Sequence, residues 1–161
     1  MKEALYTLIE AVREIDSVTL ITYSDSIRIV KEAVTGKNKA ELKGVVQALK
    51  ARGLTRGRKA IHISQMVSQK HFIHNGNNQI FIASDGRFKF EEEDYKRWKD
   101  GQGIKAIILT TIAFGDDREA IKNLKDIAHK GNGSFIRIRS LSDSYEKLLN
   151  EIKERSKRQA E

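Results

Sequence analysis

The stretch of sequence that decides the fold is Gln79-Ile80-Phe81-Ile82-Ala83-Ser84-Asp85-Gly86. Residues 79–84 form a short, almost continuously apolar run, which is typical of a strand buried in the middle of a parallel sheet. The run ends abruptly in a carboxylate and a glycine, Asp85 and Gly86. α/β sheets present functional residues in this way, at the carboxyl ends of their strands. We therefore expect a parallel sheet with Asp85 at its functional edge.

Helix-like and strand-like patterns alternate on both sides of this stretch. Before it, the sequence predicts a helix, two strands and two further helices; from Gln79 onward it predicts a strand followed by a helix three times. A short turn joins the first two strands, Val18–Tyr23 and Ile27–Val34, and indicates an antiparallel pair. Alternation of this kind predicts an α/β fold, with a doubly wound, mostly parallel sheet and helices on both faces.

Three finer predictions concern the ends of individual elements. Asn38 and Glu41 have the spacing of a capping box at a helix start. The residues from Ile104 to Phe114 form an apolar run that predicts a second buried strand. The run Gly131-Asn132-Gly133 predicts that the preceding helix closes with a glycine C-cap.

The composition indicates a single domain. The chain has 161 residues, of which 39% are hydrophobic, enough for one hydrophobic core. Residues 1–152 contain all the predicted elements, and residues 153–161 form a polar tail. The longest apolar run, from Ile104 to Phe114, is far shorter than the ~20 residues that a membrane-spanning helix needs, so no membrane span is predicted.

Several classes of chemistry are excluded by the residue types and their spacing. The chain has no cysteine, which excludes disulfides and thiolate metal sites. A Gly-x-Ser-x-Gly motif is missing, and no serine, histidine and aspartate stand at a recognisable motif spacing. His71 and His74 have a spacing that could share a metal, but no third ligand is placed near them. The sequence therefore favours a binding module over an enzyme.

Five segments, taken in order, resemble the von Willebrand factor A (VWA) family, whose fold is Rossmann-like. They resemble the family's second strand with its aspartate turn, a helix end with a threonine, the fourth strand with its aspartate, the fifth strand, and the last helix with its turn. The segments are 15–25, 49–55, 80–86, 103–115 and 124–133. The resemblance covers nearly the whole chain, and the ordered set carries it, because no single segment is specific.

The resemblance implies a protein-binding module of adhesion or scaffold type. In the family, a threonine and an aspartate help to hold a divalent cation, Mg²⁺ or Mn²⁺, which captures a carboxylate of the protein partner. The positions that match are Thr55 and Asp85. A hard cation of this kind takes oxygen ligands, as a hydroxyl and a carboxylate provide.

One landmark of the family has no match in the chain. The family's central first strand carries an Asp-x-Ser-x-Ser motif that supplies most of the metal site, and it would lie before Met1. The expectation is a VWA domain that lacks its first strand, as a fragment of a longer protein would. Because Thr55 and Asp85 alone supply few of the about six oxygens that Mg²⁺ needs, we expect metal binding by this chain to be weak or absent.

A rim of basic residues crowds the two loops that carry Thr55 and Asp85. The chain has a net charge of +8, which favours acidic partners. Two alternatives stay open: the rim binds an anion or nucleic acid without metal, or Thr55 and Asp85 serve only as a turn residue and a strand-end cap. The cations of this basic rim are Arg56, Arg58, Lys59, Arg87 and Lys89.

A missing central strand has a physical consequence for its neighbours. The predicted strands Val18–Tyr23 and Gln79–Ser84 would each keep an unpaired edge in the core. Unpaired backbone groups are costly when buried and adhesive when exposed. We therefore expect that these strands pair directly with each other, or that a second chain fills the gap and makes a homodimer.

Overall fold

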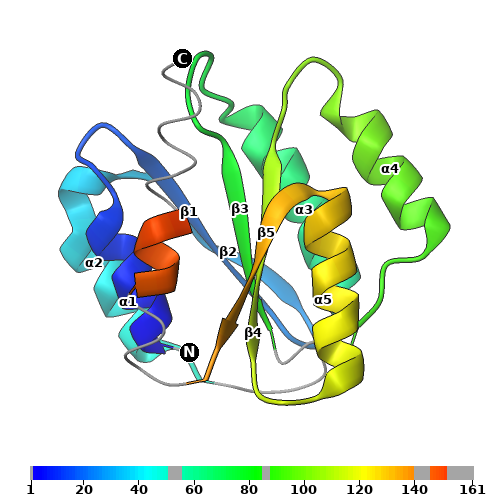
Figure 1. Cartoon of the computed structure of the whole chain (residues 1–161). Helices are drawn as coiled ribbons and strands as arrows, with labels where there is room; N and C mark the ends of the chain where they lie inside the picture. Colours follow the sequence, from blue (N-terminus) through cyan, green and yellow to red (C-terminus); the bar gives the residue numbers. More distant parts are fainter. Residues whose placement is uncertain (1, 51–55, 85–87, 140–145, 152–161) are drawn as a thin grey trace.

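Figure 1 shows helices and strands that alternate along the chain in the predicted order, which confirms the α/β class. The computed structural model describes residues 2–50, 56–84, 88–139 and 146–151, the last of which are helical. The labelled helices and strands are, in chain order, α1 (Lys2–Ala11), β1 (Ser17–Tyr23), β2 (Ile27–Thr35), the 3₁₀ turn η1 (Gly36–Asn38), α2 (Lys39–Ala48), α3 (Gly57–Lys70), β3 (Gln79–Ser84), α4 (Glu92–Gln102), β4 (Ile108–Phe114), α5 (Arg118–Lys130) and β5 (Asn132–Ile138).

The strands β3, β4 and β5 form a parallel sheet with β4 in the middle. Ile82 of β3 lies beside Thr111 of β4, and Ile112 of β4 lies beside Ile136 of β5. Residues 109–113 of β4 are all buried. A strand that is covered on both faces needs a nearly continuous apolar sequence, because neither row of its side chains reaches water. The parallel sheet predicted from residues 79–84 is therefore confirmed, but its middle strand among the described residues is β4, and β3 buries only alternate residues.

Helices cover both faces of the parallel sheet (Figure 1). On one face, α3, α4 and α5 contribute Ile61, Trp98 and Leu124 to the main core cluster. The single tryptophan, Trp98, is only 4% exposed. On the other face, Ala4 of α1 and Leu148 pack against the strands. Burying each large apolar side chain in this way stabilises the fold by about 1.5–3 kcal/mol.

The strands β1 and β2 form a separate, antiparallel ribbon, as the short turn between them predicts. Val18 pairs with Val34, and Tyr23 pairs with Ile27 next to the turn. The helices α1 and α2 pack against the ribbon through a smaller apolar cluster, whose buried members are Ile9, Leu42 and Val46. No residue of either strand is fully buried.

The ribbon and the parallel sheet do not share a backbone ladder. Among the described residues, β1 pairs only with β2, and β3 pairs only with β4, so the prediction that these strands pair directly is wrong. A side chain bridges them instead: the hydroxyl of Tyr23 donates to the carbonyl oxygen of Ala83 over 2.7 Å. Because a tyrosine ring lies between the two backbones, they stand farther apart than the about 4.8 Å of paired strands.

The second buried strand begins later than its apolar run predicts. The strand β4 starts at Ile108, and Ile104 is 96% exposed. Gly103 takes a left-handed φ of 52° at the end of α4, which turns the chain outward before the strand can start. The ammonium of Lys105 donates to the carbonyl of Gln69 over 3.0 Å and fixes this loop on α3.

Two of the predicted helix ends also need correction. Asn38 makes no side-chain cap, and its backbone (φ −100°, ψ 39°) is not in the extended conformation typical of an N-cap. The carboxylate of Glu41 pairs with Lys31 of β2 instead. At the end of α5, Gly131 has a φ of −83° and donates its N–H to Ile127, while the left-handed residue is Asn132, with a φ of 55°. Asparagine tolerates that conformation better than most residues.

Two predictions concern the tail and the membrane. Residues 152–161, which include the predicted polar tail, lie outside the described residues. In the part of the chain that the structure describes, no helix is long and apolar enough to cross a membrane.

Candidate functional site

The candidate site is built from the segments that flank the two predicted loops. Thr55, Asp85 and Arg87 lie outside the described residues. The chain is described again from Arg56, immediately after the first loop, and from Phe88, immediately after the second. These two flanks fix where both loops return to the fold.

The two flanks pack directly on each other. Gly57, the first residue of α3, lies so close to the ring of Phe88 that a Cβ atom added at Gly57 would collide with it. Phe88 itself is buried in the main core cluster. A glycine is therefore required here for the close approach of the two segments. Gly57 follows the loop that carries Thr55, and Phe88 follows the loop that carries Asp85, so the chain leaves both loops at this contact.

A buried carboxylate, Asp94, ties the same two flanks together. Its Oδ2 accepts hydrogen bonds from the backbone N–H of Glu91, over 2.9 Å, and from Nε of Arg58, over 2.7 Å. Its Oδ1 lies 3.2 Å from Nε2 of His62. Arg58 and His62 belong to α3, whereas Glu91 and Asp94 are at the start of α4. The Asp94 cluster, defined as Arg58, His62, Glu91 and Asp94, thus joins the beginnings of two helices.

The surroundings of Asp94 keep it ionised at neutral pH. Burial opposes its charge, but the hydrogen bonds from the Glu91 amide, Arg58 and His62 outweigh burial and hold the pKa of Asp94 below its ordinary value. The ionised carboxylate pairs with the guanidinium of Arg58. Arg58, predicted as a free cation of the basic rim, is therefore neutralised by a buried partner.

His62 is the second group in the cluster whose environment is unusual. Its ring stacks on Phe90, with centroids 5.5 Å apart and planes 12° apart. Its Nε2 faces Asp94, while its Nδ1 is buried without a hydrogen-bond partner among the described residues. The stacking on Phe90 and the contact with Asp94 together fix the orientation of the ring.

The other cations of the basic rim differ in their pairing. Arg56 and Lys59 are exposed, and no carboxylate of the described chain pairs with either of them. Lys89 lies 3.8 Å from Glu91, a long contact between two exposed side chains. Exposed pairs of this kind contribute little free energy. Within the described part of the rim, Arg56 and Lys59 remain available to a ligand.

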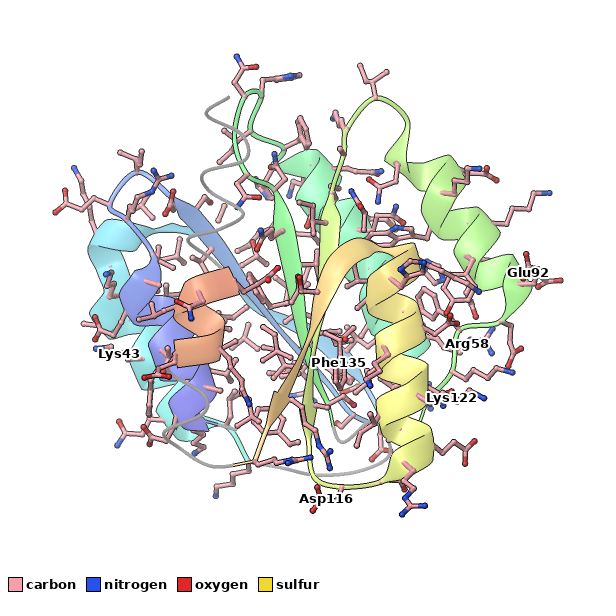
Figure 2. All side chains as sticks on the ribbon, viewed as in Figure 1. Lys43, Arg58, Glu92, Asp116, Lys122 and Phe135 are labelled. Atoms are coloured by element: carbon pink, nitrogen blue, oxygen red, sulfur yellow. The ribbon has the colours of Figure 1, made fainter. Side chains whose placement is uncertain are left out.

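A third loop reaches the same edge of the molecule. The bond between Tyr23 and Ala83 joins the last residue of β1 to the end of β3, so the turn at residues 24–26 lies at the carboxyl end of the sheet. Beyond β4, Asp117 caps α5 by accepting from the N–H of Ala120 over 3.0 Å. We call the end of the sheet where these loops lie the carboxyl-end edge. Figure 2 shows Asp116 in the loop that follows β4 at this edge.

No metal centre is assembled from the described residues alone: none of their acidic side chains and histidines form a group of three or more that could hold an ion. Asp94 is engaged by three donors and is not available as a ligand. His71 bonds to Glu32 over 2.7 Å, and His74 contacts the ring of Phe72, so the two histidines have separate partners. The predicted ligands Thr55 and Asp85 lie outside the described residues, so their role stays a prediction.

Sequence reasoning did not find the Asp94 cluster. From the sequence alone, the acids at the start of α4 indicate only charges that favour a helix N-terminus. The spacing of Glu91 and Asp94 is that of a capping box, and it was the available signal. The contacts from Arg58 and His62 come from another helix, and no local pattern encodes them.

Comparisons with known proteins agree with this architecture. No protein-family model matches the chain. A curated relative, the uncharacterised protein YfbK of Escherichia coli (strain K12), is 28% identical over 157 residues, which cover 96% of this chain and 27% of the relative. The chain thus spans only about a quarter of the length of the curated relative it matches.

Solved structures of VWA domains share the fold. A von Willebrand factor type A protein from Catenulispora acidiphila superposes with a TM-score of 0.75 and 19% identity, over 92% of this chain and 36% of its own. The conserved hypothetical protein BatB from Bacteroides thetaiotaomicron gives a TM-score of 0.74 and 16% identity, over 97% of this chain and 86% of its own.

A third neighbour is a structure with a metal. Proximal thread matrix protein 1 from the mussel byssus, with a zinc-occupied MIDAS motif, gives a TM-score of 0.65 and 13% identity, over 94% of this chain and 41% of its own. These likenesses show that the chain has the fold of a VWA domain.

Proposed function

We propose that this chain is a protein-binding module of VWA type, whose partner docks at the carboxyl-end edge of the sheet. The observation that carries the proposal is the convergence of the two loop flanks, through the contact of Gly57 with Phe88 and through the Asp94 cluster. A fold that uses a glycine contact and a buried ion pair to hold two polar loops together provides a rigid base for binding residues. Sites of this kind lie at the carboxyl ends of parallel strands.

The proposed binding is metal-dependent when the site is complete. Thr55 and Asp85 would supply a hydroxyl and a carboxylate oxygen to Mg²⁺ or Mn²⁺, and the zinc-occupied MIDAS motif of the mussel protein supports a divalent ion in this fold. A bound cation would supply an open coordination position for a carboxylate of the partner. With two ligands the site is weak, so this chain needs millimolar metal.

The proposed partner is acidic. Arg56 and Lys59 are exposed at the start of α3 with no carboxylate of the described chain paired to them, and the net charge is +8. Cations around an anion-binding position raise the rate of encounter with acidic proteins and select against basic ones. Arg87 and Lys89, on the second loop and its flank, would extend the same field.

The proposed role is binding rather than catalysis, because the sequence offers no nucleophile and base at motif spacing. The rival function is metal-independent binding of an anion or nucleic acid through the basic rim. The aromatic residues nearest to that rim argue against bases stacking there, since Phe90 and Trp98 are both buried. The two functions differ in their requirements: the first needs a divalent cation, and the second weakens steeply with salt.

Self-association is a further part of the proposal. The facing edges of β1 and β3 are joined by the side chain of Tyr23, and neither edge is paired within the described chain. Open strand edges pair readily with another strand. We propose that a strand of a second copy fills this position and makes a homodimer. The dimer fraction of the wild type and of Tyr23→Phe, measured by sedimentation velocity, tests the proposed homodimer.

Thermal unfolding with and without Mg²⁺ or Mn²⁺ tests the metal-dependent site. At ten times its dissociation constant, a metal would stabilise the wild type by about 1.4 kcal/mol. We expect Asp85→Ala to abolish this shift, and Asp100→Ala, which removes an exposed carboxylate of α4, to retain it. An equal shift in all three proteins, or none in the wild type, would contradict metal binding by Asp85.

A further inference from the structure

A basic groove runs along α5, beside the carboxyl-end edge but outside the loops that carry Thr55 and Asp85. It has a volume of about 610 Å³, within the range of small-ligand and peptide sites. Figure 2 shows Lys122 on α5, on the side that faces Arg58 and Glu92. We call this surface the α5 groove; its lining residues are Lys89, Glu119, Lys122, Asn123, Lys125, Asp126 and His129.

The lysines of the α5 groove have little compensation from the protein's own carboxylates. Lys122 and Lys125 are exposed, and in the described chain no carboxylate pairs with either ammonium. Lys89 has only its long contact to Glu91. Three positive charges with little internal compensation therefore face one hollow. Such a surface attracts carboxylates or phosphates.

One of the two carboxylates in the groove is already occupied. Oδ2 of Asp126 accepts a hydrogen bond from the hydroxyl of Tyr95 over 2.8 Å and lies 3.5 Å from the ammonium of Lys130. Glu119 stands in the first turn of α5, where the helix dipole favours a negative charge. The groove thus keeps an excess of positive charge after its own acids are accounted for.

The aromatic rings next to the groove are covered by lysines. The ammonium of Lys125 lies over the ring of Phe135, 5.5 Å from its centroid, and that of Lys130 lies 3.7 Å from the centroid of Tyr95. Single-stranded nucleic acids bind largely by stacking bases on open aromatic faces. Covered rings, together with Glu119 in the wall, disfavour a nucleic acid and leave side-chain carboxylates as the better match.

We propose that the α5 groove binds an acidic, extended peptide segment of a partner protein. Lys122 and Lys125 stand three residues apart on a helix, so their side chains start about 5–6 Å from each other. Alternate side chains of an extended peptide lie on one side about 6.6 Å apart. A peptide with an acid at every second position therefore presents carboxylates at about the spacing of these two lysines, and Lys89 adds a third cation to the lining of the groove.

This site is independent of the metal-dependent site at Thr55 and Asp85. Only Lys89 belongs to both the basic rim and the groove, and no metal ligand is required. The test is therefore done in EDTA, where the metal-dependent function is absent. Fluorescence anisotropy would measure binding of a labelled peptide of alternating glutamate and serine to the wild type and to the double variant K122E/K125E.

The chain offers a matched control for this double variant. Lys96 and Lys99 are also exposed, also three residues apart on a helix, and lie on α4 outside the groove. The variant K96E/K99E therefore changes the net charge equally. We expect K122E/K125E to weaken peptide binding about tenfold, as the loss of two charge pairs implies, and K96E/K99E to weaken it less than about threefold.

Three outcomes would overturn the proposal: equal weakening by both double variants, no binding of the peptide to the wild type, or tighter binding of labelled oligothymidylate than of the peptide. The last would assign the groove to nucleic acid. If K122E/K125E melts below the wild type, K122Q/K125Q replaces it, with K96Q/K99Q as control, and the same ordering is expected. A failed metal test at Asp85 leaves these expectations unchanged.

Discussion

The parallel sheet and the antiparallel ribbon are built from similar residues but are buried very differently. In the sheet, residues 109–113 of β4 are buried, with helices on both faces. In the ribbon, every residue of β1 and β2 keeps some exposure, and α1 and α2 provide a smaller cluster. Because hydrophobic stabilisation follows the apolar area removed from water, most of the folding free energy resides in the sheet.

This difference indicates that the molecule has a rigid half and a softer half. Regions with few buried apolar contacts open with lower free energy than the global unfolding reaction. The candidate site lies on the rigid half, where the flanks of both loops are fixed to α3 and α4. Matched substitutions in the two halves should therefore differ in the free energy of unfolding that they remove.

The largest difference is expected between Ile112→Ala and Ile21→Ala. Ile112 of β4 is fully buried, and its truncation leaves a cavity, so we expect a loss of about 4 kcal/mol. Ile21 of β1 is half-buried and pairs with Ile29, so we expect a loss of about 1 kcal/mol from the same substitution. Urea unfolding would measure both. Equal losses would mean that the ribbon is as well packed as the sheet.

An intermediate difference is expected between Asp94→Asn and Asp16→Asn. Asp94 is buried in its cluster, and the substitution weakens its charge-assisted hydrogen bonds, whereas the half-exposed Arg58 stays hydrated, so we expect a cost of about 2 kcal/mol. Asp16, at the entrance to β1, pairs with the exposed side chain of Arg13 over 2.8 Å, so its loss should cost less than about 1 kcal/mol. Chemical denaturation at pH 7 would measure both free energies of unfolding.

The pH dependence of Asp94 has a definite sign. Its folded pKa is lowered, so the stabilisation from the ionised carboxylate is present above its unfolded pKa, about 3.9, and is lost as the pH falls through the folded value. Acid titration of stability should therefore be flatter below about pH 4 for Asp94→Asn than for the wild type. Parallel acid profiles would mean that Asp94 is not held ionised by its donors.

The smallest effect is expected for Tyr23→Phe, which cuts the bridge between the two halves. The carbonyl of Ala83 loses the donor at 2.7 Å, and we expect a loss of about 1 kcal/mol. Hydrogen exchange should rise in β1 and β2 more than in β4. Because the substitution frees a strand-edge carbonyl, the dimer fraction in sedimentation velocity should also rise. A monomer at every concentration, in both proteins, would contradict the proposed homodimer.

The sequence predicts the fold well where local pattern and burial agree. The apolar run at residues 79–84 forms the strand β3, which buries every second residue, and Asp117 caps α5 as its position before the helix implies. Prediction fails where a tertiary contact overrides the local pattern. Glu41 pairs with Lys31 instead of capping its own helix, and the apolar Ile104 stays outside because Gly103 turns the chain first.

The candidate site is predictable only in part. A carboxylate and a glycine after a buried strand point to Asp85, and the resemblance adds Thr55. What holds their loops together is the contact of Gly57 with Phe88 and the position of Asp94 between two helices. These contacts join residues about thirty positions apart, and such pairings follow from the fold rather than from any local spacing.

The position of the single tryptophan makes the two halves optically distinguishable. Trp98 is buried in the core of α3, α4 and the parallel sheet, where its carbonyl accepts from Nε2 of Gln65 over 2.7 Å. Its intrinsic fluorescence therefore reports the solvent state of that half alone, whereas circular dichroism averages over all the backbone. Recording both signals in one denaturant titration tests whether the molecule unfolds cooperatively. Coincident transitions indicate a single folding unit, and separated transitions indicate two.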